Sequence, residues 1–207
     1  MKTALDKVSD PVARAALEQR ACELMTDAVR QHGLEAVEST RRIATVHEAG
    51  HAVIFQITAD GIRWWPPYEL RVFRLPVRGA MFWSGYTDVS PKAPPESVDT
   101  RVDPNGAVIF IMRAISGWLA EQLFCPPEDR RPASSVDELL LAQATAGGLA
   151  AHWECSPPKA FDRVTGLATD MLERNQTPLL RLADALERTR KVAGADLKRL
   201  LAGVKYP

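Results

Sequence analysis

Residues 42–54 contain the sequence His-Glu-Ala-Gly-His, which constrains the fold more than any other part of the chain. On an α-helix, residues four apart lie on one face about one turn apart, so His47 and His51 can present two imidazole nitrogens to one ion. Glu48 lies beside them, where a carboxylate outside the coordination shell can act as general base for a water molecule that the ion activates. The spacing therefore predicts a helix that carries a zinc site.

The competing interpretation is a chance match on an ordinary buried helix. An HExxH pattern arises by chance in about one chain in a hundred or fewer at this length. A core histidine bonded to a backbone carbonyl explains one buried imidazole, but it explains poorly two of them with a glutamate between. The apolar residues at helical spacing around the motif are Val46, Gly50, Val53 and Ile54. The pattern thus favours the zincin arrangement on a buried helix.

The charge of the chain gives no electrostatic support for binding nucleic acid or an acidic membrane surface. Lys plus Arg and Asp plus Glu number 26 each, so the net charge is zero and the pI is about 6.9. The three cysteines, Cys22, Cys125 and Cys155, are odd in number and form no CxxC pair, which indicates reduced thiols. We therefore expect a cytoplasmic protein with no nucleic-acid partner and no membrane partner.

Two further segments bear on localisation. Residues 1–7 are polar and lack the apolar core of a signal peptide. The most hydrophobic run, residues 107–124, includes Arg113 and Glu121, so it is expected to be a buried amphipathic helix rather than a membrane span.

Hydrophobic periodicity predicts a mainly α chain with a small antiparallel β-sheet, an α+β class. Helices are expected at residues 11–31, 39–58, 106–124, 159–175, 178–191 and 195–203, with one more beginning after Ser135. Two or three strands are expected among residues 62–65, 68–75 and 80–89, with a turn at 78–79. The expected organisation is an N-terminal helical segment (1–38), a zinc-binding core with the sheet (39–150) and a C-terminal helical bundle packed on it (151–207).

A catalytic zinc needs a third protein ligand and one open position. Neither His32 nor His152 lies a short distance after the motif, and a carboxylate from a later helix is the other standard solution. Ser135 and Glu138 form a capping-box pattern that places Asp137 in the first turn of a helix. From the spacing alone, stabilisation by the helix dipole is the favoured explanation of an acid there, so the third ligand stays open at this point.

The whole chain resembles the protease domain of the FtsH family, which comprises membrane-anchored, ATP-dependent zinc metalloproteases. The resemblance covers most of residues 40–203. The segments that carry it are His47–Ala52, Arg78–Ala80, Gly85–Thr87, Ser116–Glu121, Ser135–Asp137 and Ala168–Leu201.

This resemblance implies roles for particular residues. Asp137 would be the third zinc ligand, and Glu121 would be a carboxylate that orients a ligand histidine. Gly85, Tyr86 and Thr87 would belong to a substrate-binding strand, because an exposed sheet edge can take an extended peptide as an additional strand. The simpler alternative is that the sheet only covers one side of the zinc helix.

The chain also departs from the family pattern. Residues 116–118 read Ser-Gly-Trp where the family has GGR, Gln122 replaces a glutamate, and residues 125–132 are unusually rich in proline. The sequence contains no GxxxxGK[ST] loop, no arginine-finger helix and no membrane span. ATP-driven unfolding of substrates is therefore not expected of this chain alone.

Three functions follow from these features. The first is an ATP-independent zinc metalloendopeptidase that hydrolyses peptides or unfolded protein, with Zn²⁺ held by His47, His51 and Asp137 and with Glu48 as general base. The second is a non-catalytic, zinc-stabilised protein-binding module, against which the presence of Glu48 argues. The third is a peptidase subunit that depends on a separate ATPase. Family members form rings through their protease domains, so homo-oligomers are implied by the resemblance.

Overall fold

The structure is a computed structural model that describes residue 30 and residues 40–77, 80–89, 103–130 and 136–206. In these ranges the chain is mainly helical with one small antiparallel sheet, which confirms the α+β class. The expected helix at residues 11–31 lies outside the described residues.

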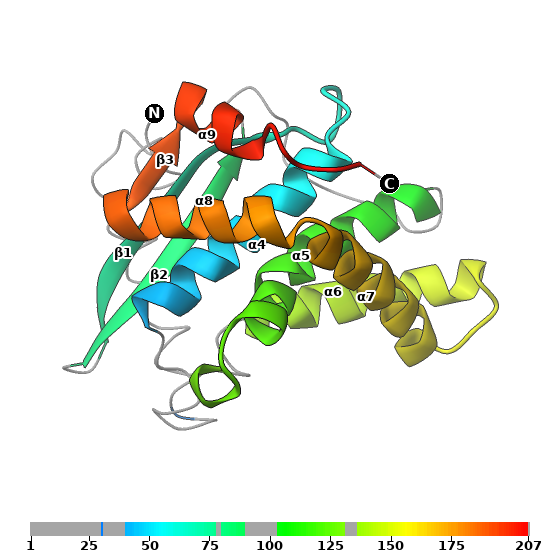
Figure 1. Cartoon of the computed structure of the whole chain (residues 1–207). Coiled ribbons are helices and arrows are strands. Elements are labelled where there is room, and N and C mark those ends of the chain that lie inside the picture. The colour runs from blue at the N-terminus through cyan, green and yellow to red at the C-terminus, as the bar shows by residue number, and fades with distance from the viewer. Residues whose placement is uncertain (1–29, 31–39, 78–79, 90–102, 131–135, 207) are drawn as a thin grey trace, which may run out of the picture.

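Helix α4 (Arg41–Thr58), which carries the His-Glu-Ala-Gly-His motif, is the central element. Figure 1 shows the sheet and helix α5 on different sides of α4, and α4 contacts both of these and α8. The helix begins after Thr40, whose Oγ1 accepts a hydrogen bond from the backbone N–H of Ile43 at 3.2 Å. The expected helix at 39–58 is therefore confirmed, and its motif lies where the sheet and the other helices meet.

Strands β1 (Pro67–Val77) and β2 (Ala80–Val89) form an antiparallel hairpin with Leu70 opposite Thr87 and Val72 opposite Gly85. Leu70 and Val72 are buried in the core that α4 shares. Strand β3 (Lys191–Ala193) pairs antiparallel with the other edge of β1, so the strand order is β2-β1-β3. Among the strands that the structure describes, β2 thus keeps one unpaired edge.

Of the three runs in which two or three strands are expected, two form β1 and β2, and residues 62–65 form no strand. The Asp60 carboxylate accepts hydrogen bonds from the backbone N–H groups of Ile62, Arg63 and Trp64 at 2.8, 2.9 and 2.8 Å. These bonds curl the backbone into a turn and occupy donors that a sheet would need. The third strand is instead β3, which lies between two of the expected C-terminal helices and is too short to show an alternating pattern.

The remaining helices agree with the expected ones to within a few residues. They are α5 (Pro104–Phe124), α6 (Val136–His152), α7 (Pro157–Arg174), α8 (Gln176–Thr189) and α9 (Gly194–Leu201), with a short 3₁₀ turn, η1 (Pro127–Asp129), after α5. Apolar side chains from all these α-helices join the core around α4. The C-terminal helices therefore pack on the same core as the motif helix.

Helix α5 is long and apolar enough to cross a membrane by length and composition alone. Of its most apolar 18-residue window, 56% is buried inside the protein, and core helices pass the same test. Figure 1 shows α5 between α4 and the helices α6 and α7. Cys125, which follows it, is a free thiol whose burial raises its pKa to about 11, which makes it unreactive near neutral pH.

A buried carboxylate links the three strands. Glu69 on β1 is 1% exposed, and its oxygens lie 2.7 Å from Arg71 Nε and 2.9 Å from Lys191 Nζ of β3. The hydroxyl of Tyr86 on β2 donates to the same carboxylate at 3.2 Å. Burial alone would raise the pKa of Glu69, but its bond to Lys191 and the charge of Arg71 hold the pKa below its usual value.

Replacing Glu69 with glutamine is expected to lower the free energy of unfolding at pH 7 by roughly 1.5–3 kcal/mol, the range for hydrogen bonds to charged groups. A carboxylate whose pKa is lower in the folded state stabilises the folded protein at pH values above its pKa in the unfolded state. This stabilisation is lost as the pH falls through its pKa in the folded state. The difference in the free energy of unfolding between wild type and variant should therefore become smaller below about pH 4. Urea unfolding from pH 3 to 7 measures it, with the exposed Glu173→Gln as control. A difference that stays constant with pH would contradict this role.

Candidate metal centre

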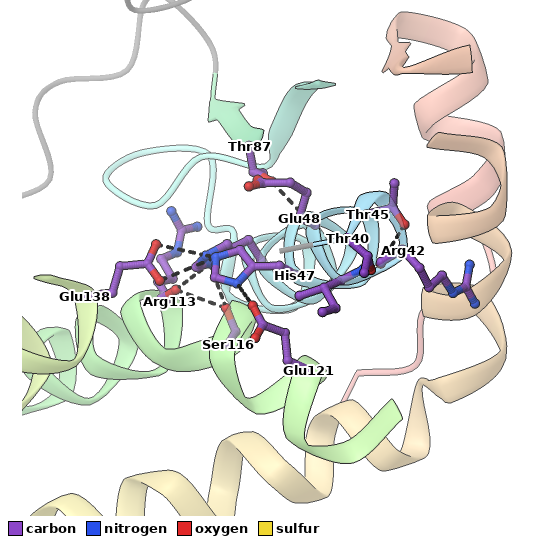
Figure 2. A network of polar contacts seen from close by, with 12 residues as sticks. Thr40, Arg42, Thr45, His47, Glu48, Thr87, Arg113, Ser116, Glu121 and Glu138 are labelled. Atoms are coloured by element: carbon purple, nitrogen blue, oxygen red, sulfur yellow. Dashed lines mark hydrogen bonds and ion pairs between the residues drawn. The ribbon is translucent and has the colours of Figure 1, made fainter. Parts of the chain in front are cut away.

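Three side chains from two helices converge at one point. The Nε2 atoms of His47 and His51 on α4 lie 3.0 Å apart. The Glu138 carboxylate of α6 lies 3.2 Å from His51 Nε2 and 3.5 Å from His47 Nε2. Figure 2 shows Glu138 directed toward the imidazole of His47 from the neighbouring helix. Their ligand atoms all lie within 4.8 Å of one another, so the group could hold a metal ion.

The other nitrogen of each imidazole has a fixed partner. Nδ1 of His47 lies 2.7 Å from Glu121 Oε1, and Nδ1 of His51 lies 2.9 Å from the backbone oxygen of Arg113. Both partners are acceptors, so each Nδ1 carries the proton and donates it. Each neutral imidazole then presents an Nε2 lone pair, and two lone pairs facing each other beside a carboxylate are suited to a cation. The residues present therefore fit a metal ion.

The charges around the two histidines also favour a cation at this point. When the histidines carry protons instead of an ion, burial disfavours the imidazolium, but the carboxylates of Glu138 and Glu121 outweigh it and raise the pKa of His47 well above its usual value. Burial would likewise raise the pKa of Glu138, but the charges of His51 and His47 hold it far below the ordinary range. Positive charge at this point is thus strongly favoured, and protons would compete with a metal for it.

Glu48 lies outside the ligand group. Figure 2 shows its side chain directed toward Thr87 of β2, away from Glu138. Thr87 Oγ1 donates to Glu48 Oε2 at 2.7 Å and lies 3.0 Å from the Glu48 backbone oxygen. Glu48 is 4% exposed, and this burial raises its pKa, although His47, His51 and Thr87 partly oppose the shift. The carboxylate is therefore held rigidly as a stronger base than an exposed glutamate.

Two glycines make room for these side chains. A Cβ atom added at Gly117 of α5 would lie 2.4 Å from His47 Nε2 and 2.5 Å from His51 Nε2. One added at Gly85 of β2 would lie 2.5 Å from Glu48 Cγ. Real Cβ atoms do not approach so closely, so the imidazoles and Glu48 occupy space that any larger residue would take.

Replacing Gly117 with alanine is expected to weaken metal binding by about 10–100-fold, because displaced imidazoles lose their convergence. The matched control is Gly147→Ala on α6, where an added Cβ meets nothing within 4 Å. Competition with a chromogenic zinc chelator measures both affinities. Equal affinities in the two variants would show that the imidazoles move aside without cost.

Replacing Glu121 with glutamine is expected to reduce metal affinity by about 10–100-fold, since Glu121 acts on the ion only through His47. Glu121 is 1% exposed, and an amide of the same shape keeps its packing while removing the charge that supports the Nδ1 proton. Chelator competition again gives the affinity, and thermal unfolding of the metal-free variant reveals any general loss of stability. A metal affinity equal to that of the wild type would show that Glu121 contributes only to packing.

The structure places most of the predicted site residues together. His47 and His51 converge at one point, Glu48 lies beside them with its carboxylate bonded to Thr87, and Glu121 contacts His47. Asp137 is the second residue of α6, but its side chain lies outside the described part, so its role as ligand stays a prediction. The carboxylate that the structure brings to the histidines belongs to Glu138, which the sequence pattern had identified only as a helix cap.

The predicted substrate strand divides between two faces. Gly85 and Thr87 contact Glu48, whereas Tyr86 faces the opposite side and bonds to Glu69. Ser116 and Gly117 had been assigned no role of their own from the sequence. The Ser116 hydroxyl lies 3.0 Å from both His51 Nδ1 and the Arg113 backbone oxygen. Neither residue has a local pattern that marks it, because both act through contacts with α4.

Comparison with known proteins adds no relative. No protein-family model matches the chain, and a search of curated proteins finds no match. The case for a function therefore rests on the geometry of the site.

Proposed function

We propose that this protein is a zinc-dependent metalloendopeptidase, similar to FtsH protease domains, that hydrolyses bonds in peptides or unfolded protein without ATP. The observation that carries the proposal is the orientation of the two imidazoles. Each is held by an acceptor at Nδ1 and presents Nε2 to Glu138, with the buried Glu48 beside the group but outside it.

Zinc is the ion we propose for this site. Two histidines and one carboxylate are a donor set found in catalytic zinc sites, where three protein ligands leave a fourth position for water or substrate. A bound zinc ion supplies a lowered pKa for a water molecule and polarisation of the scissile carbonyl. The partners of Nδ1 support this assignment, because ligand histidines usually donate that proton to a carboxylate or a carbonyl.

The proton transfers are assigned to Glu48. Its carboxylate takes a proton from the attacking water and then delivers it to the leaving amine, so that one group acts as base and as acid. The raised pKa that burial gives Glu48 suits both steps, and Thr87 Oγ1 holds one oxygen in place at 2.7 Å. A purely structural metal site would not need this buried acid.

The sheet provides a place for an extended substrate. Strand β2 has an unpaired edge among the described strands, and its Gly85 and Thr87 lie against Glu48. A peptide added at this edge would make backbone hydrogen bonds and bring its chain past the site in a defined register. Folded proteins cannot offer such a strand easily, so we propose peptides and unfolded segments as substrates.

The test uses protein stripped of metal by a chelator and then reloaded. About one zinc per chain is expected by elemental analysis, as one three-ligand site requires. Cleavage of a fluorescently labelled unfolded protein without ATP should disappear on stripping and return with stoichiometric zinc. Cleavage that is insensitive to the chelator, or no retained zinc, would overturn the proposal.

A second candidate, a zinc-stabilised binding module, is favoured by one observation. The ligands and their partners join α4, α5 and α6, so an ion would tie three helices together. Zinc that is retained and needed for folding, without cleavage of any unfolded protein, would support this function. Recovery of cleavage with an added ATPase, together with a complex of increased size, would instead identify a peptidase subunit.

A further inference from the structure

Three arginine side chains from separate elements surround one tryptophan. The guanidinium carbons of Arg41 on α4, Arg74 on β1 and Arg190 after α8 lie 5.2, 5.4 and 5.4 Å from the ring centre of Trp83 on β2. We call this group the arginine cluster. The chain as a whole carries no net charge, so three like charges on one ring form a local concentration that composition does not explain.

The arginine cluster differs from its neighbour in its partners. Arg42, the next residue of α4, is paired with Asp184 at 2.6 Å and Glu187 at 3.1 Å. In the part of the chain that the structure describes, no carboxylate is paired with any of the three clustered arginines, and Nε of Arg41 is buried without a hydrogen-bond partner. As far as the described residues are concerned, the N–H groups of the cluster can donate to an anion.

The cluster lies on the face of α4 that carries Glu48 and on the face of β2 that contacts Glu48. Arg41 is seven residues before Glu48, which is close to two full turns and about 10 Å along α4. Trp83 shares one face of β2 with Gly85 and Thr87, which contact Glu48. Strand β2 thus runs from Trp83 of the cluster to the residues that contact the proposed base, and one of its edges is unpaired among the described strands.

We propose that Arg41, Arg74 and Arg190, arranged around Trp83, form a subsite that binds a carboxylate of the peptide substrate. At about 3.4 Å per residue of extended chain, this carboxylate would lie roughly three residues from the bond that is cleaved. It belongs to an acidic side chain or to the C-terminus, since these are the anionic groups of a peptide. The inference rests on the proposed function, and it makes acidic peptides the preferred substrate class.

The chemistry of the cluster suits this ligand. Guanidinium groups bind carboxylates through paired N–H donors, and the flat face of Trp83 supports the guanidinium planes while leaving their edges free to donate. Arg74 lies directly opposite Trp83 in the β1–β2 register, so the two are held together by the sheet itself. The cluster is therefore organised before a ligand arrives.

The experiment measures binding separately from cleavage. Zinc-loaded Glu48→Gln protein is titrated into labelled eight-residue peptides by fluorescence anisotropy. The peptides differ only by Glu or Gln at the third position on either side of the central bond, and each has a free or an amidated C-terminus. The acidic member of a pair should bind roughly tenfold tighter, as expected for charge-assisted hydrogen bonds. The pair that shows the difference identifies the source of the carboxylate.

Further substitutions in the Glu48→Gln protein test whether the arginine cluster causes the preference for acidic peptides. Arg41→Gln combined with Arg74→Gln should abolish the tenfold difference. Arg188→Gln, at an exposed arginine on α8, also removes a positive charge and should retain the difference. Arg190→Asn is a second test, because asparagine tolerates the φ of 60° at that position. Circular dichroism verifies that each variant is folded.

The outcomes separate the two proposals. Equal affinities for acidic and neutral peptides, or the same loss in Arg188→Gln, would overturn the subsite while leaving the peptidase intact. Failure of every peptide to bind would count against the peptidase and the subsite together.

Discussion

Replacing Glu48 with glutamine is expected to reduce hydrolysis of an unfolded protein by roughly 10³-fold, within the usual range for loss of a general base. Glutamine has nearly the same shape and can still accept a hydrogen bond from Thr87, so the packing of this buried residue should survive. It cannot take a proton from water near neutral pH. Steady-state cleavage by the zinc-loaded proteins measures the loss.

The control for this prediction is the metal itself. Glu48 lies outside the ligand group, so Glu48→Gln should retain about one zinc per chain with unchanged affinity. The exposed Glu173→Gln on α7 provides the same change of charge far from the site in sequence and should cleave like wild type. Full activity in Glu48→Gln would remove the general base from the proposal, and loss of zinc would make Glu48 part of the metal site.

Replacing Glu138 with alanine is expected to weaken zinc binding by at least about 100-fold and to abolish hydrolysis, because a ligand is lost rather than a partner of a ligand. In the structure the carboxylate of Glu138 lies 3.2 and 3.5 Å from the two Nε2 atoms. Asp137→Ala is the matched variant, because it removes one negative charge from the adjacent position of the same helix turn.

Chelator competition and thermal unfolding distinguish the two acids. A zinc concentration 100 times the dissociation constant stabilises the folded state by about 2.7 kcal/mol, so wild type and Asp137→Ala should gain thermal stability on adding zinc. Glu138→Ala should gain little at the same concentration. The reverse pattern would identify Asp137 as the third ligand and would assign Glu138 to the helix cap.

The parts of this protein that depend on local spacing could be predicted from the sequence. The helix that carries the motif follows from the 3.6-residue period, and the same period brings His47 and His51 to one side with Glu48 adjacent. The long hairpin follows from two β-rich runs around a short turn. Each of these features is a property of residues close together in the chain.

Tertiary packing determined which side chains face these residues. Glu138 reaches the histidines from 87 or more residues away, and neither its position nor that of Asp137 in the sequence shows which carboxylate turns inward. The partners of the imidazoles, Glu121 and the Arg113 carbonyl, are likewise set by the packing of α5 on α4. A helical pattern specifies a buried face but not the atoms that face it.

The same distinction holds for the sheet and the arginine cluster. Strand β3 pairs with β1 just after α8 ends, and Arg41, Arg74 and Arg190 come from three separate elements to surround Trp83. No local pattern relates these residues. The sequence by itself therefore determined the positions of the two histidines and of Glu48 at the candidate site, through the geometry of a single helix. The carboxylate that faces the two histidines and the arginine cluster were decided only by tertiary packing, because they depend on contacts between distant segments.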